Sequence, residues 1–311
     1  MKIATVGEIL VEMVAHSRGD GFAERQDFAG PFASGAPAIF IDQIAKMGLP
    51  CSIFGAVGSD DFGRINLERL RADGVDTSHI NVVQDLPTGI AFVRYRPDGS
   101  RGFLFTLKGS ASEQILDKAD DVVLDSFTHL HIMGSSLCSP RLATFIDAFA
   151  RRVKSRSGTI SLDPNLRLDL LPNDPTEAIA TLRRWAMMAD FLLPSEGELG
   201  ALADGDTDED RIASLIARGV PEIVLKQGAA GATAFTTASN IKMSAPRVDE
   251  VDPTGAGDIF GATYVAARLS GSTVEGALRL AVHAGAYSVT HFGPMEGTIT
   301  RQQLNSLISA S

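Results

Sequence analysis

The sequence predicts an α/β protein built on a largely parallel sheet with helices on both faces. Short apolar runs rich in β-branched residues alternate with longer amphipathic stretches over most of the 311 residues, and such strand–helix alternation is typical of a parallel sheet. Several of the short runs are continuously apolar, as strands buried on both faces require. A hydrophobic content of 44% is ample for a large core.

The expected elements follow one another in a regular order. Strands are expected at residues 3–6, 52–57, 129–133, 159–162, 191–193 and 222–225. Helices are expected at residues 36–47, 63–73, 140–155, 176–188 and 209–217, and two long ones follow at 255–269 and 274–291.

One region breaks this alternation. The strand-like runs 90–95 and 103–107 flank the turn signal Pro97-Asp98-Gly99-Ser100, which predicts a hairpin. The length is compatible with about two domains, but a large α/β domain with a small appendage fits equally well. We therefore expect one domain over residues 1–311, with a β lid inserted from about 11–30 and 86–110.

Composition excludes several classes of protein. A formal net charge of -10 argues against a nucleic-acid partner, although local backbone dipoles would still hold an anionic nucleotide. The sequence has two cysteines in no recognisable pattern, which favours a cytoplasmic protein with reduced thiols. Its apolar runs are too short to span a membrane, and its start reads as a strand.

Two common nucleotide-binding motifs are missing. After the first expected strand, Gly7 has no second glycine in the range that a dinucleotide-binding fingerprint needs. Gly30 and Gly35 have the spacing of a P-loop, but Ala36 and Pro37 stand where that loop needs lysine and a hydroxyl. A nicotinamide oxidoreductase is therefore disfavoured.

The segment 252–258, with the sequence D-P-T-G-A-G-D, carries the strongest chemical signal. Thr254 suits the cap of a helix, and three small residues then fill its first turn, where backbone N–H groups lack intrahelical partners. These residues predict an anion hole for a phosphoryl group: Gly255, Ala256 and Gly257. Asp258 would lie close enough to take the proton of an attacking hydroxyl. A merely capped helix is the alternative, but three small residues lower helix propensity, which favours function.

This segment resembles the C-terminal signature of the ribokinase-like (PfkB) carbohydrate kinases. Four further regions match the family in its order: residues 30–38 continuing into 55–63, 163–167, 194–198 and 226–231. The matches cover nearly the whole chain. The resemblance implies a ribokinase-like sandwich with a small β-sheet lid, and an ATP-dependent sugar kinase that uses Mg²⁺.

The resemblance also implies a role for individual residues. Asp258 would be the catalytic base, and Glu198 would organise Mg²⁺ through water. A monovalent cation such as K⁺ would lie near Asp252. The nucleotide would bind along Lys226, Gly228, Gly231, Ser195 and Gly293, with adenine against the helix 274–291 and the turn 292–294. Ser195 stands where the family usually has asparagine.

The positions that would contact the sugar depart from the family pattern. Glu12 replaces a usual aspartate, Ser34-Gly35 replaces a Gly-Gly pair, and Ile39 replaces an asparagine. Arg94 and Arg167 are candidates for pairing with a substrate carboxylate. Alternatively, lid arginines face solvent, and Arg167 serves phosphate or structure.

We therefore predict a kinase for a small-molecule sugar, with a ketohexose such as tagatose or fructose favoured by the similarity of residues 34–43 to bacterial tagatose kinases. The main alternative substrate is 2-keto-3-deoxygluconate. A sugar- or nucleotide-binding protein without catalysis is the alternative class. The hydrophobic hairpin also makes a homodimer through the lid a prediction.

Overall fold

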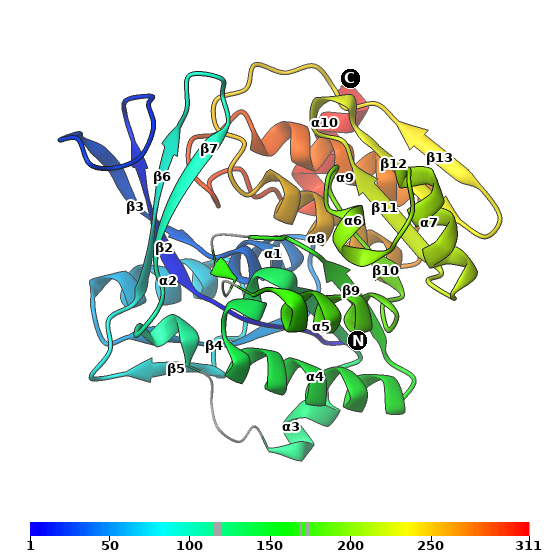
Figure 1. Cartoon of the computed structure of the whole chain (residues 1–311), viewed down its shortest axis with the longest axis horizontal. Coiled ribbons are helices and arrows are strands. Elements are labelled where there is room, and N and C mark those ends of the chain that lie inside the picture. The colour runs from blue at the N-terminus through cyan, green and yellow to red at the C-terminus, as the bar shows by residue number, and fades with distance from the viewer. Residues whose placement is uncertain (115–119, 168–169, 172–173, 311) are drawn as a thin grey trace.

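The computed structural model describes residues 1–114, 120–167, 170–171 and 174–310. Its main sheet contains nine strands in this part of the chain. They are β1 (Ile3–Val6), β4 (Cys51–Gly58), β5 (Ile80–Val83), β8 (His129–Met133), β9 (Thr159–Asp163), β10 (Phe191–Leu192), β11 (Glu222–Lys226), β12 (Ala232–Thr236) and β13 (Asn240–Met243). Their order is β13-β12-β11-β10-β9-β8-β1-β4-β5 (Figure 1).

The α/β fold class is confirmed. All six strands expected from the sequence lie next to one another and parallel at the centre of this sheet. The sequence missed β5 and the antiparallel strands β12 and β13, which lie at the two ends of the sheet. The centre is mainly apolar, and every residue of β4 is buried.

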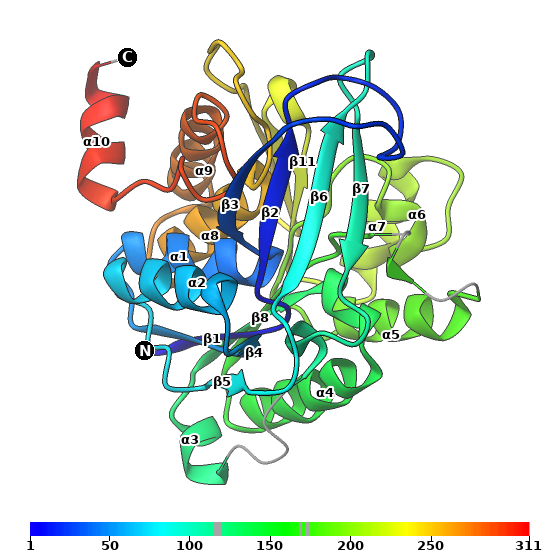
Figure 2. The ribbon, with the colours of Figure 1, turned by 90° about the vertical axis from the view of Figure 1, so that its left-hand side faces the viewer.

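Helices cover both faces of this sheet (Figure 2). One core lies beneath α1 (Ala36–Lys46), α2 (Asp61–Ala72), α8 (Ala256–Leu269), α9 (Val274–Ser288) and α10 (Arg301–Ala310). The other lies beneath α3 (Asp121–Asp125), α4 (Pro140–Ser155), α5 (Thr176–Ala186), α6 (Leu199–Leu202) and α7 (Asp208–Ala217). The chain therefore forms three layers, as a sheet that is apolar on both faces requires.

A second, small sheet stands against the main one. It contains β2 (Leu10–Ala15), β3 (Phe28–Ser34), β6 (Gly89–Tyr95) and β7 (Arg101–Thr106), in the order β3-β2-β6-β7. β2 follows β1 directly, so the small sheet rises from the carboxyl edge of the main sheet (Figure 2). β6 and β7 lie within the second region expected for the lid, and β2 lies within the first to one residue, whereas β3 runs on to Ser34, beyond residue 30.

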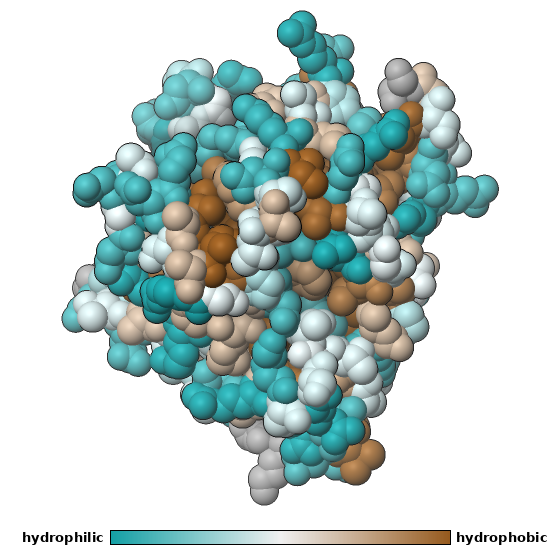
Figure 3. All heavy atoms as spheres, turned by 90° about the vertical axis from the view of Figure 1, so that its right-hand side faces the viewer, coloured by the Kyte–Doolittle hydropathy of each residue, from teal (hydrophilic) through white to brown (hydrophobic). Residues whose placement is uncertain are grey.

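The surface is mostly hydrophilic on the side next to β13 and α7. On this face, hydrophobic side chains form separate patches between hydrophilic ones (Figure 3). Among the described residues, the helices are too short or too polar to cross a membrane.

Candidate functional site

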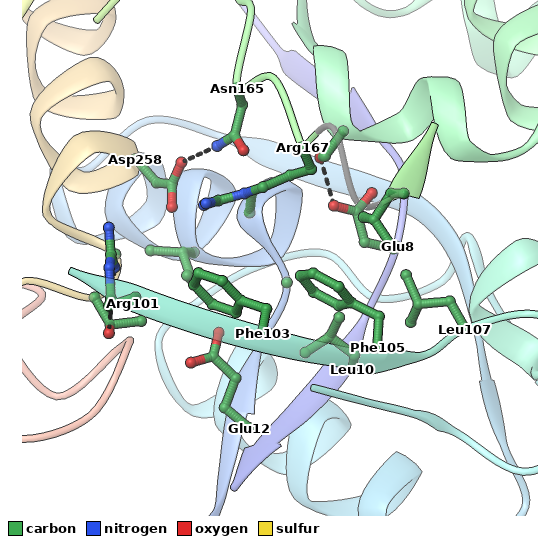
Figure 4. A pocket seen from close by; sticks show the side chains of 17 residues that line it. Glu8, Leu10, Glu12, Arg101, Phe103, Phe105, Leu107, Asn165, Arg167 and Asp258 are labelled. Carbon is green, nitrogen blue, oxygen red and sulfur yellow. Dashed lines mark hydrogen bonds between the residues drawn. The ribbon is translucent and has the colours of Figure 1, made fainter. Parts of the chain in front are cut away.

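Two cavities meet where the small sheet faces the start of α8. The first, called the inner pocket, lies under β2 and β7 (Figure 4). Its lining consists of Glu8, Leu10, Glu12, Gly35, Ala36, Ile39, Arg101, Phe103, Phe105, Leu107, Ser135, Asn165, Arg167, Leu170, Thr254, Gly255 and Asp258. The second, called the outer groove, has a volume of about 690 Å³ and lies between β11, the segment 245–250, α8 and α9. The first turn of α8 separates the two.

The backbone at the start of α8 has the form of an anion site. Gly255 caps the helix with a left-handed φ of 77°, and a Cβ there would collide with the carbonyl oxygen of Pro294. Only glycine fits this position. Among the described residues, the N–H groups of Gly257 and Asp258 have no hydrogen-bond partner, so they are free for an anion.

The expected cap was therefore wrong by one residue. Thr254 precedes the cap, and its N–H donates to the carboxylate of Asp252 at 2.9 Å. The left-handed glycine turns the chain into the helix instead, which a threonine could not do without strain. The shift leaves Ala256 as the first residue of α8.

Asp258 is the acid that faces the inner pocket from this helix. The residue is only 6% exposed, and Asn165 Nδ2 donates to its Oδ1 at 3.1 Å (Figure 4). Burial raises the pKa of Asp258 to about 7; the charge of Asp163 also raises it, and that of Lys226 lowers it. A carboxylate with this pKa is suited to accept a proton near neutral pH.

A buried ion pair lies behind this acid. Lys226, at the end of β11, donates to Asp163, at the end of β9. Burial raises the pKa of Asp163. Burial lowers the pKa of Lys226, but the nearby carboxylates, Asp163 first and then Glu198 and Asp258, together raise it above the usual value. The amino group of Lys226 also lies beside Gly257, 3.7 Å from where a Cβ would be. The lysine therefore brings a positive charge to the groove side of the anion site.

Two further acids form the far wall of the inner pocket. Ser34 Oγ donates to Glu12 Oε1 at 2.6 Å, and Glu12 Oε2 is buried without a partner among the described residues. Glu8 accepts from the hydroxyls of Ser135 and Ser136. Burial raises the pKa of both glutamates. The two residues that depart together from the family pattern, at positions 12 and 34, are thus in direct contact.

The arginines are arranged differently from the prediction. Arg167 lies in the inner pocket, with its guanidinium 5.0 Å from the ring centre of Phe103 (Figure 4). Arg94 lies outside the inner pocket. Its side chain is buried on the face of β6 that is turned away from this pocket, where it donates to the carbonyls of Ser17 and Gly21. Successive side chains of a strand point to opposite faces, and this alternation directs Arg94 into the 17–21 loop.

The outer groove contains most residues expected to contact a nucleotide. Ser195, Lys226, Gly228 and Gly231 line it. α9 supplies Val282, Gly285 and Ala286, and the adenine expected against this helix stays a prediction. The segment from Ala245 to Glu250, which the sequence did not single out, closes one side.

The family model for pfkB family carbohydrate kinases matches residues 2–301. The chain belongs to this family. It is consequently a phosphotransferase that acts on a hydroxyl of a sugar.

Relatives of this kinase differ in their named substrates. It is 32% identical to fructokinase-2 of Zea mays over 83% of this chain and 77% of the relative. It is 30% identical to 2-dehydro-3-deoxygluconokinase of Bacillus subtilis over 98% of this chain and 95% of the relative. A protein from E. coli assigned as ribokinase II, solved in complex with ATP and Mg²⁺, superposes with a TM-score of 0.93 at 41% identity, covering 100% of this chain and 99% of that one.

Glu198 and Asp252, expected near the metal ions, are held by backbone groups. Glu198 accepts from the N–H groups of Leu166 and Ser195 at 2.8 and 2.7 Å. The described residues contain no cluster of three or more acids, histidines or cysteines suited to a metal. Mg²⁺ keeps several waters and binds largely through phosphate oxygens, and the water-mediated role of Glu198 stays a prediction.

Asp252 ties three segments together. Tyr95 donates to its Oδ1, which also accepts from the N–H of Thr254, and Gly293 donates from its N–H to Oδ2 at 3.0 Å. Gly293 therefore lies behind the anion site, not in the outer groove where the sequence placed it. A monovalent cation beside Asp252 stays a prediction.

Four polar residues of the inner pocket were missed by sequence reasoning: Glu8, Arg101, Ser135 and Asn165. Glu8 and Asn165 follow the carboxyl ends of β1 and β9, the edge at which parallel sheets bind ligands, so their positions carried a usable signal. Arg101 carried none, because its role depends on where the small sheet docks.

Proposed function

We propose that this kinase transfers the γ-phosphoryl group of ATP, supported by Mg²⁺, to a hydroxyl of a ketohexose such as tagatose or fructose. The observation that carries the proposal is the position of the start of α8 between two cavities. Gly255 and Asp258 line the inner pocket, and Ala256 and Gly257 line the outer groove. A sugar and a nucleotide bound in them would meet at this turn.

The chemistry follows from that geometry. The sugar hydroxyl loses its proton to Asp258 while its oxygen forms a bond to the γ-phosphorus. The bond from that phosphorus to the bridging oxygen breaks, and its electron pair leaves with ADP. The free N–H groups of Gly257 and Asp258 stabilise the equatorial oxygens of the phosphoryl group during its transfer. Mg²⁺, when bound, neutralises charge on the phosphates.

The polar atoms of the inner pocket favour a neutral polyol. Glu12 Oε2 and Asn165 Oδ1 are buried acceptors without partners among the described residues. Leaving such acceptors unpaired is costly, and sugar hydroxyls are the donors that would satisfy them. With Glu8 and Asp258 in the same pocket, a substrate carboxylate would face several acids.

One observation favours 2-keto-3-deoxygluconate as a second candidate. Arg167 lines the inner pocket, and a guanidinium there would pair with the carboxylate of a sugar acid. The relative from Bacillus subtilis with that activity in its name makes this alternative concrete.

An assay of ADP release from MgATP separates the candidates. The panel contains D-tagatose, D-fructose, D-ribose, adenosine and 2-keto-3-deoxygluconate. We expect the highest kcat/KM with a ketohexose, and the Arg167→Gln variant to lower it by less than about 10-fold, because a neutral sugar offers no carboxylate to pair with. Turnover of the keto acid alone, abolished by Arg167→Gln, would overturn the ketohexose proposal.

Removing the hydroxyl of Ser34 tests whether Glu12 recognises the sugar. Without the 2.6 Å bond from Ser34, the Glu12 carboxylate loses its fixed orientation. A hydrogen bond to a charged group contributes about 1.5–3 kcal/mol, so Ser34→Ala is expected to raise KM for the sugar about 10-fold or more. Because the bond lies away from Asp258, kcat should stay within about 3-fold, and an unchanged KM would exclude this role.

A further inference from the structure

Arg101 lies at the junction of the two cavities. It is the first residue of β7, and it lines both the inner pocket and the outer groove. Its guanidinium lies 5.7 Å from the ring centre of Phe103, which lines the inner pocket on the same strand. An arginine in this position can contact a group that crosses from one cavity to the other.

Two contacts fix the small sheet against the start of α8 at this point. Arg101 is directly opposite Tyr95 in the pairing of β7 with β6. The Tyr95 hydroxyl bonds the carboxylate of Asp252 and lies 3.2 Å from Thr254 Oγ1. Arg101 Nη1 donates to the same Thr254 Oγ1 at 3.4 Å. Thr254 immediately precedes the capping Gly255, so Arg101 is held next to the anion site.

Of the two cations around this point, Arg101 is the one without a carboxylate partner among the described residues, since Lys226 pairs with Asp163. Arg101 forms no ion pair with a carboxylate of the described residues, unlike Arg69 or Arg268. It lies beside the positive end of the α8 dipole, and Lys226 approaches the same turn from the groove side. The only hydrogen bond that the Arg101 guanidinium makes to a described residue is the one to Thr254, so its other N–H groups can donate to an anion bound at this turn. The planar guanidinium of Arg101, on its long side chain, is suited to bind the oxygens of a phosphoryl group.

We propose that Arg101 is a further catalytic residue, whose guanidinium binds the γ-phosphoryl group while that group passes from the outer groove to the inner pocket. Arg101 forms no covalent bond in this step. It donates N–H groups to the equatorial oxygens while the sugar oxygen bonds to phosphorus, the proton goes to Asp258 and the leaving electron pair goes to ADP. Because Arg101 is part of the small sheet, the site is complete only when that sheet is docked. The proposal rests on the phosphoryl transfer proposed above, but not on which sugar accepts it.

The test separates contact with the γ-phosphoryl group from general binding. For Arg101→Met, affinity is measured by calorimetry for MgADP and for the magnesium complex of AMP-PNP, a non-hydrolysable analogue that keeps the γ-phosphoryl group. We expect affinity for AMP-PNP to fall about 10-fold while affinity for ADP is unchanged. With the sugar that the wild type turns over best, kcat should fall about 10²- to 10³-fold, and Arg101→Lys should recover part of it.

Leu104→Ala is the matched control. Leu104 lies on the same strand, is 47% exposed and points away from the pocket, so its truncation should leave kcat and both affinities unchanged. An equal loss of affinity for both nucleotides would overturn the proposal, and so would a raised KM for the sugar with kcat unchanged. If the wild type turns over no sugar of the panel, the proposed substrate class fails, whereas the comparison of the two nucleotides still decides the role of Arg101.

Discussion

Replacing Asp258 with asparagine is expected to lower kcat about 10²- to 10⁴-fold, the range found when a general base is lost. The carboxylate is buried at the boundary of the two cavities and accepts a bond from Asn165. Asparagine keeps the size of the side chain but cannot accept a proton. The measurement is steady-state ADP release at saturating MgATP and sugar.

The same substitution is expected to stabilise the fold above pH 7, which distinguishes a lost base from a misfolded protein. Folding raises the pKa of Asp258 from 3.8 to about 7, so the folded state holds the proton more tightly than the unfolded chain does. Stability contributed by this group is therefore lost as the pH rises through that range. Asparagine has no such penalty, and Asp258→Asn should melt at a higher temperature than the wild type at pH 8.

The pH dependence of the wild type provides a second check on the base. Because Asp258 must be ionised to accept a proton, kcat/KM should rise with pH up to about 7 and then level off. Asp61→Asn is the matched control, since Asp61 lies in the first turn of α2 and is exposed. It should leave both the rate and the pH profile unchanged. A profile that is flat from pH 5 to 8 would contradict the assignment of Asp258.

Most of the fold was predictable because the central strands are buried on both faces. A strand such as β4 is buried at every residue and contains mainly apolar ones, so it can be recognised without a periodic pattern. β12 and β13 lie at one end of the sheet; β12 is only partly buried, and β13 alternates exposed and half-buried residues and contains a lysine, so their pattern is weak. Short end strands carry little hydrophobic signal, and their pairing is decided by the rest of the sheet.

The site was predictable where local backbone chemistry requires particular residues. The glycine at 255 and the acid at 258 are tied to the start of one helix, so adjacent residues in the sequence are adjacent in space. Arg94 and Arg101 show the opposite case. Both are arginines of one hairpin, but strand register and the docking of the small sheet direct one into a loop and the other to the anion site. Those are tertiary properties that local sequence does not encode.

Replacing Lys226 with methionine is expected to destabilise the fold by about 3–5 kcal/mol, because it leaves a buried charge without its partner. Only 11% of the Lys226 side chain and 2% of that of Asp163 are exposed, so water cannot replace the lost ammonium group. The free energy of unfolding in urea measures this loss. It should be larger at pH 8 than at pH 5, because burial already raises the pKa of Asp163, and without the lysine the carboxyl is stable only when protonated.

The double variant Asp163→Asn/Lys226→Met decides whether charge or packing causes the loss. Removing both charges leaves no unpaired ion, and replacing a whole buried pair is often close to neutral, so most of the stability should return. Kinase activity should not return, because Lys226 lines the outer groove beside the anion site. The surface pair of Lys154 and Asp190 is the matched control: its lysine is 38% exposed, and Lys154→Met should cost less than about 1 kcal/mol. If stability returns and turnover does not, the buried pair serves catalysis and not the fold. If the double variant is as unstable as Lys226→Met, the methylene chain of the lysine, and not its charge, supports this part of the sheet.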